Sequence, residues 1–214
     1  MADRWYNKKG KALRKIMKIS KINKNIKIIS RASDRSVNGL IKVFRNALKR
    51  LEIFYKIKIS NLIVELVYSR SEFEEKISYK STPSWLVAIS KKNKVFLMSP
   101  SIMEKESCHK KREINKIVTH ELCHVFNKKI NKNTLMWVDE GMAQFLAGQK
   151  RVRVPDEKDL EIFYRNFFVK NVRLMEFSKN KGYEISYWII KTLSKVLKRD
   201  GLIELTKISF REKL

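Results

Sequence analysis

The spacing of the apolar residues changes near Pro100, and this change constrains the fold more than any other feature of the sequence. Upstream lie three short runs typical of strands, NLIVELVYS, WLVAIS and KVFLMSP, the last two joined by Lys-Lys-Asn. Downstream, helical spacing covers about residues 109–129, 138–149, 156–169 and 182–199, and Asp200-Gly201 is a typical helix stop. A small mixed sheet followed by a mainly helical subdomain is an α+β fold.

Two further helices are expected before Pro100. From about Ser36, seven apolar residues fall on one helix face, which predicts an amphipathic core helix with a basic outer side. These residues are Val37, Leu40, Ile41, Phe44, Leu48, Leu51 and Phe54. A short helix is expected after Ser71, because Glu74 completes a capping-box pattern.

Residues 1–32 form the most biased segment, with eleven Lys or Arg up to Arg31 and a single acid, Asp3. Apolar residues recur here from Leu13 to Ile29 at helical spacing, although the IKII stretch also tolerates a strand. Three interpretations remain open: a helix packed on the domain, a disordered basic arm, or a segment that binds nucleic acid or a membrane surface. We therefore separate a basic N-terminal arm or helix, residues 1–32, from a domain over residues 33–214.

The chain carries 48 Lys and Arg against 22 Asp and Glu, so its surface attracts phosphate, anionic lipid or acidic protein. The N-terminus lacks the apolar core of a signal peptide, and no window approaches the roughly 18 apolar residues of a membrane span. The two cysteines, Cys108 and Cys123, fit a reducing compartment. These features predict a cytoplasmic protein without a transmembrane segment.

The stretch IVTHELCHVF contains two of the three histidines of the chain, four positions apart. In a helix, positions i and i+4 share a face, so His120 and His124 can direct imidazole nitrogens at one ion about 2.0 to 2.1 Å away. Zinc lowers the pKa of water toward neutrality, and Glu121 can accept the proton of the attacking water and pass it to a leaving amine. The motif therefore predicts a zinc site with the parts needed for amide hydrolysis.

A catalytic zinc usually has three protein ligands and an open position. His109 lies over ~15 Å from His120 if one helix carries both, and is a poor candidate for the third ligand. The stretch LMWVDEGMAQFLAG is a better source. Glu140 can direct a carboxylate back onto the metal, and Gly141, without a Cβ, allows its helix to approach closely.

These two motifs resemble those of the gluzincin metallopeptidases, in which His-Glu-x-x-His is completed by a glutamate in a Trp-x-x-Glu-Gly-x-Ala segment. The similarity is to the compact peptidase-MA-like families and, more distantly, to the catalytic domain of the aminopeptidase-N family. It implies that residues 33–214 form a zincin-like metallopeptidase domain. It also implies that His120, His124 and Glu140 are zinc ligands and that Glu121 is the general base.

The resemblance continues in GYEISYWIIKTLSKVLKRDGLIEL, where compact relatives carry a Tyr that supports the tetrahedral intermediate. Tyr183 and Tyr187 share one helix face, and we favour Tyr183 for this role. One turn after Glu140, where relatives often carry an acid that orients a zinc histidine, this chain has Gln144, which would raise ligand basicity less. In gluzincins an edge strand above the active-site helix pairs with an extended peptide, a role open to WLVAIS and KVFLMSP.

The leading interpretation is a zinc-dependent peptidase, a hydrolase acting on a peptide or protein substrate. The alternative is a non-catalytic or weakly catalytic protein that retains a zincin scaffold and binds nucleic acid or an anionic surface through its basic face. A third interpretation combines the two, as in the SprT-like DNA-repair proteases. Those enzymes use a third histidine downstream of the motif, and this chain has none after His124.

Overall fold

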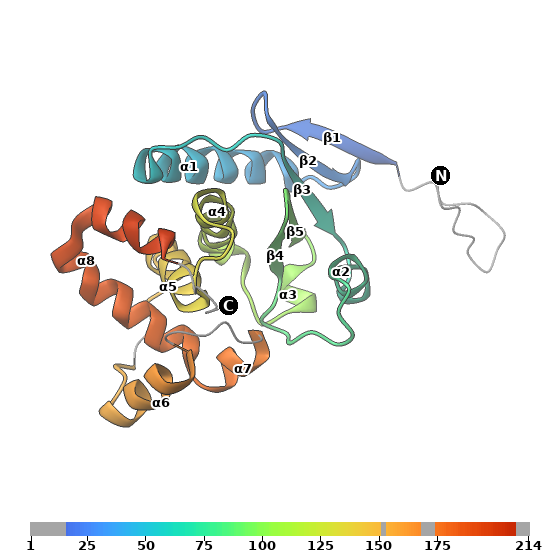
Figure 1. Cartoon of the computed structure of the whole chain (residues 1–214). Helices are drawn as coiled ribbons and strands as arrows, with labels where there is room; N and C mark the ends of the chain where they lie inside the picture. Colours follow the sequence, from blue (N-terminus) through green and yellow to red (C-terminus); the bar gives the residue numbers. More distant parts are fainter. Residues whose placement is uncertain (1–15, 151–152, 168–173, 209–214) are drawn as a thin grey trace, which may run out of the picture.

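The computed structural model describes residues 16–150, 153–167 and 174–208. Five strands form one mixed sheet in the order β1-β2-β3-β5-β4, and helices pack on its two faces (Figure 1). The strands are β1 Met17–Lys21, β2 Ile26–Arg31, β3 Leu62–Val67, β4 Ala88–Lys91 and β5 Lys94–Met98. The pairs β2–β3 and β3–β5 are parallel, whereas β1–β2 and β4–β5 are antiparallel. The predicted α+β class is confirmed.

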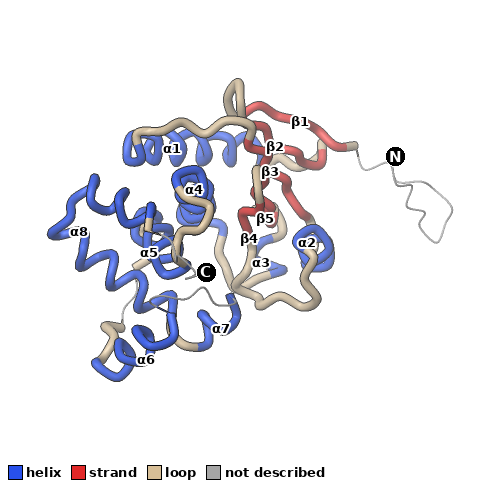
Figure 2. Tube along the Cα trace, in the orientation of Figure 1, coloured by secondary structure: helices blue, strands red, loops and turns tan. Residues whose placement is uncertain are grey.

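Helices supply the rest of the regular structure in the described chain (Figure 2). They are α1 Val37–Tyr55, α2 Arg70–Ile77, α3 Met103–Glu106, a 3-10 turn at Lys111–Glu113, α4 Ile114–Ile130, α5 Met136–Ala147, α6 Glu157–Phe167, α7 Leu174–Lys179 and α8 Gly182–Lys207. The predicted helix face of α1 is largely buried, including Phe44 and Leu51. α4 lies between α1, β4 and α5, so the predicted metal motif sits at the centre of the molecule (Figure 1).

Both faces of the sheet contribute to the core, and the face toward α1 and α4 is the more regular of the two. Every second residue of the central strands is buried on this face, because successive strand side chains alternate between the two faces. The residues concerned are Ile26, Ile28, Leu62, Val64, Leu66, Val95 and Leu97. At the edge of the sheet, β4 lies beside α4 (Figure 1).

Of the three interpretations of the N-terminal segment, a packed helix is wrong for residues 17–31, whereas the strand that the IKII stretch also allowed is present. These residues form β1 and β2, and β2 joins the sheet by parallel pairing with β3. In β2, buried Ile26 and Ile28 flank exposed Lys27, a period of two that the wider helical spacing obscured. Leu13 and the rest of residues 1–15 lie outside the described part of the chain.

Several boundaries also differ from the sequence-based expectation. The N-cap of α2 is Ser69, whose hydroxyl accepts from the backbone N–H of Glu72, rather than Ser71. The expected end of the last helix near residue 199 coincides with a break at Lys198, but a second helical segment follows and continues through Asp200-Gly201 to Lys207. Burial of Leu202 and Thr206 explains the continuation, since tertiary packing outweighs the roughly 1 kcal/mol helix penalty of one glycine. None of the described helices is long and apolar enough to cross a lipid bilayer.

Candidate metal centre

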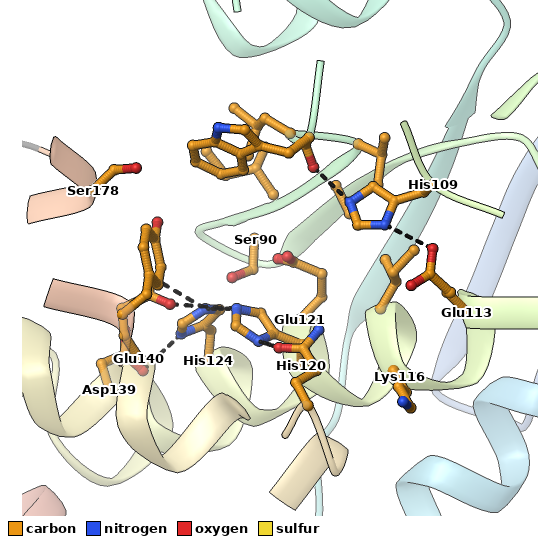
Figure 3. A pocket seen from close by; sticks show the side chains of 18 of the residues that line it. Ser90, His109, Glu113, Lys116, His120, Glu121, His124, Asp139, Glu140 and Ser178 are labelled. Atoms are coloured by element: carbon orange, nitrogen blue, oxygen red, sulfur yellow. Dashed lines mark hydrogen bonds and ion pairs between the residues drawn. The ribbon is translucent and has the colours of Figure 1, made fainter. Parts of the chain in front are cut away.

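His120 and His124 lie on one face of α4, as their spacing predicts. Their rings meet edge to face with centroids 4.7 Å apart, and their Nε2 atoms are 3.1 Å apart. Figure 3 shows both rings directed into the same cavity. Two nitrogen donors of this kind, on adjacent turns of a buried helix, can bind the same ion.

Glu140 comes from α5, which packs against α4. Its carboxylate oxygens lie 3.4 Å from Nε2 of His120 and 3.7 Å from Nε2 of His124. One donor atom from each of the three residues falls within 4.8 Å of the others. The three predicted ligand residues are therefore brought together, and the group could hold a metal ion.

The buried carboxylates of Glu121 and Glu140 would be stabilised by a bound cation. One oxygen of Glu121 and one of Glu140 are buried without a hydrogen-bond donor among the described residues. An unpaired buried carboxylate oxygen is unfavourable, and a cation or its associated water would satisfy both oxygens. Glu121 follows His120 directly and is 7% exposed, so it lines the cavity without belonging to the ligand group.

The second nitrogen of each histidine has its own partner. Nδ1 of His124 lies 2.8 Å from Oδ1 of Asp139, and Nδ1 of His120 lies 2.9 Å from Oε1 of Gln149. These partners fix both rings with Nε2 toward Glu140. Sequence reasoning assigned no role to either residue: Asp139 stands directly before Glu140, a usable signal, whereas Gln149 is 29 residues from His120 and gives none.

Gln144 does not take the place expected of it. Its side-chain amide donates to the backbone carbonyls of Tyr183 and Glu140, at 3.0 and 3.3 Å. This amide thus joins α5 to the start of α8. The carboxylate that contacts a histidine of the group is instead Asp139, directly before Glu140 in the sequence.

A buried polar chain continues behind Asp139. Asn127 donates to Asp139 Oδ1 at 2.8 Å, and the hydroxyl of Tyr55 donates to Asn127 Oδ1 at 2.6 Å. Tyr55 also contacts the thiol of Cys123 at 2.9 Å. The orientation of His124 therefore depends on contacts that reach from α5 through α4 to α1.

The electrostatics of the group favour positive charge. Burial opposes protonation of His124, but Asp139 and Glu140 outweigh it and raise the pKa of His124 to about 9. Burial would raise the pKa of Asp139, yet His124 holds it below its usual value. Burial raises the pKa of Glu121, against the opposing effect of the two histidines. A carboxyl with a raised pKa is suited to accept and return a proton near neutral pH.

The metal-ligand group opens into a cleft of about 720 Å³. One wall runs from Trp85 to Ser90, which includes the start of the edge strand β4, and Tyr183 lies on another wall. The Tyr183 ring packs edge to face between Trp85 and Phe177, with centroids 5.9 and 5.3 Å away. Tyr187, the other tyrosine of α8, packs beside Trp188 instead.

His109 lies apart from the metal-ligand group. It precedes α4 instead of starting it, and its ring nitrogens contact Glu113 at 3.1 Å and the carbonyl of Trp85 at 2.8 Å. Its role is to attach the Trp85 wall to the start of α4. Cys108 and Cys123 are both free thiols.

Comparison with known proteins agrees with this arrangement. A search of curated proteins found no match. One family model, described as "Peptidase of plants and bacteria", matches residues 26–161, more than half of the chain. The match includes the sheet from β2 onward, α4 and all of α5, and it implies a peptide or protein substrate. The chain belongs to the BSP family of plant and bacterial peptidases.

Proposed function

We propose that the protein is a zinc-dependent peptidase of the gluzincin type. The observation that carries the proposal is the convergence of His120, His124 and Glu140 in the cleft that buried Glu121 also lines. Two imidazoles and one carboxylate are a ligand set found in catalytic zinc sites. When bound, zinc supplies a Lewis acid that polarises the peptide carbonyl and makes water easier to deprotonate.

In the proposed reaction, Glu121 accepts a proton from the water that attacks the peptide carbonyl. The same carboxyl then gives the proton to the amine that leaves. Its burial raises the pKa of Glu121 above the ordinary value of a glutamate, which makes the carboxylate a stronger base toward the water proton. Tyr183 lines the cleft from α8, and we propose that its hydroxyl donates to the oxyanion that develops on the carbonyl.

The partners of the two histidines contribute through orientation. Asp139 and Gln149 occupy the Nδ1 atoms, so each Nε2 lone pair is available to the ion. A carboxylate on Nδ1 also raises the basicity of His124 as a ligand. We therefore assign Asp139 and Gln149 as positioning residues of the proposed site.

Zinc analysis and peptide hydrolysis, measured on the same protein samples, test the proposal. We expect about one zinc per chain, which His120→Ala, His124→Ala or Glu140→Ala should remove. Glu121→Gln should retain zinc and lose hydrolysis, since an amide keeps the shape but cannot accept the proton. Zinc at full occupancy without hydrolysis by the wild type would favour the non-catalytic alternative, and full activity in Glu121→Gln would remove Glu121 from the reaction.

A further inference from the structure

The edge strand β4 presents a specific set of backbone groups to the cleft. In an antiparallel pair, residues alternate between those that bond to the neighbouring strand and those that point away from it. Met98 donates its backbone N–H to the carbonyl of Val87, and the same register pairs Ile89 with Phe96. Val87 and Ile89 therefore face β5, whereas the N–H and C=O groups of Ala88 and Ser90 point to the open edge.

The side chain of Lys128 is bonded to one of the backbone groups at the open edge of β4, the carbonyl of Ser90. Lys128 follows His124 by four residues on α4, so it extends the helix face that carries both histidines. Its ammonium donates to the carbonyl of Ser90 at 3.4 Å. Ser90 and Lys128 both line the cleft that contains Glu121. A peptide that adds to β4 finds both groups of Ala88 available but only the N–H of Ser90.

Because the Ser90 carbonyl is already bonded to Lys128, the groups that a substrate can contact at this position are all hydrogen-bond donors. They are the Ser90 N–H and the Lys128 ammonium. An ammonium has three N–H donors, and one is directed at Ser90. Lys128 is exposed and forms no direct ion pair with a carboxylate of the described residues, although its positive charge acts to lower the pKa of Glu121 and of Asp139. The Ser90 N–H and the remaining ammonium donors match a carboxylate, which accepts several hydrogen bonds and bears the opposite charge.

We propose that Lys128 and the Ser90 N–H form a subsite for an acidic side chain, so that the enzyme prefers peptides with Asp or Glu at one fixed position from the cleaved bond. This inference rests on the proposed peptidase function and specifies its substrate class. The other charged residues of the cleft outside the metal-ligand group are mixed in sign, with Lys116 and Lys150 against Glu113, Glu121, Asp139 and Glu184. The selectivity therefore comes from Lys128 at one position and not from a uniformly basic cleft.

Cleavage-site mapping tests this proposal and requires no identified substrate. A complex mixture of synthetic peptides is digested with the zinc-loaded wild type, with Lys128→Gln, with Lys128→Glu and with Lys129→Gln, and the cut positions are identified by mass spectrometry. Lys129 is exposed and adjacent in sequence but turned about 100° around the helix, so its variant controls for the loss of one charge. A matched peptide pair with Glu or Gln at the selected position then gives kcat/KM for each enzyme.

We expect enrichment of Asp and Glu at one position for the wild type and for Lys129→Gln. Lys128→Gln should lower the ratio of kcat/KM for the Glu peptide to kcat/KM for the Gln peptide by up to about fivefold, the upper end of what an exposed ion pair contributes. Lys128→Glu should shift the enrichment to Lys and Arg. Cleavage without acidic enrichment, or enrichment that persists in Lys128→Gln, overturns the subsite while the peptidase function stands. Absence of any cleavage by zinc-loaded wild type overturns the function itself, and the subsite with it.

Discussion

Nδ1 of His124 lies 2.8 Å from Oδ1 of Asp139, while Nε2 of the same ring lies 3.7 Å from Glu140. Neighbouring residues of α5 thus engage the two nitrogens of one imidazole. Asn127 holds Asp139 in place with a hydrogen bond of 2.8 Å, and Tyr55 holds Asn127. The contact between His124 Nδ1 and Asp139 is therefore part of a buried network. This network restricts the orientation of the imidazole ring and hence the direction of the Nε2 lone pair.

Asp139→Asn should weaken zinc binding by about 10- to 100-fold and leave the fold intact, because the amide keeps the size but loses the charge that orients and activates His124. Zinc affinity is measured by competition with a chelator, and far-UV circular dichroism reports the fold. Asp200→Asn is a control with the same loss of charge at an exposed ion pair with Lys56. Equal zinc affinities for Asp139→Asn and the wild type would show that the contact does not support the site.

Tyr183→Phe should lower kcat by about 100-fold with little change in KM, since the hydroxyl is proposed to act mainly on charge that develops in the transition state. The phenyl ring keeps the edge-to-face contacts with Trp85 and Phe177, so the cleft wall should remain in place. Tyr187→Phe provides the matched control, because Tyr187 lies one turn away and packs beside Trp188. A loss of activity of the same size in both variants would indicate a structural effect in place of a catalytic one.

Local geometry explains which parts of the site could be predicted from the sequence. His120 and His124 share a face because one helix carries both, and that pattern is complete within four residues. The position of Glu140 depends on how α5 packs on α4, which only the family resemblance indicated. The Gln149–His120 and Lys128–Ser90 contacts join segments 29 and 38 residues apart, and no local signal marks such pairs.

The same distinction applies to the fold. The strands β3 and β5 and the helix α1 follow from apolar runs whose periodicity is clear. β2 is ambiguous in the sequence because its isoleucines fit both a helical and an alternating spacing, and pairing with β3 decides in favour of the strand. The continuation of α8 beyond Gly201 likewise depends on the burial of Leu202 by the rest of the molecule.

Gly141→Ala should destabilise the protein by about 1 to 3 kcal/mol, the usual cost of overpacking. A Cβ at this position would lie 2.6 Å from the carbonyl oxygen of Ser186 and 2.7 Å from a side-chain carbon of Ile190. The glycine therefore permits the close helix approach expected from the sequence, and the helix it approaches is α8. Separation of the two helices would also displace Tyr183 from the cleft, so activity should fall as well.

Gly39→Ala is the matched control for this variant. Gly39 also lies inside a helix, but a Cβ there would meet nothing within 4 Å. Alanine should therefore stabilise the protein by about 0.5 to 1 kcal/mol through its better helix propensity. Urea unfolding of both variants measures the difference. An unchanged stability in Gly141→Ala would mean that α5 and α8 can separate without cost.

Asp34 should make the stability of the sheet depend on pH. Burial opposes its ionisation, but hydrogen bonds from Ser36, Ser99 and Tyr68 lower the pKa of Asp34 below its ordinary value. Ser99 directly follows β5, Tyr68 directly follows β3, and Asp34 itself lies shortly after β2. The carboxylate of Asp34 therefore connects the carboxyl ends of three neighbouring strands. A carboxyl whose pKa is lower in the folded chain stabilises the fold above its unfolded pKa of about 3.9, and this contribution is lost as the pH falls through the folded pKa.

Asp34→Asn should consequently be less stable than the wild type by about 1 to 2 kcal/mol at pH 7, where the charged hydrogen bonds are present. The difference should shrink as the pH falls below about 4 and both side chains become neutral. Unfolding curves at pH 7 and near pH 3 measure it, with Glu157→Gln, at an exposed position, as the control for the loss of one negative charge. A destabilisation of equal size at both pH values would assign the effect to lost packing, because the ionised carboxylate contributes only at the higher pH.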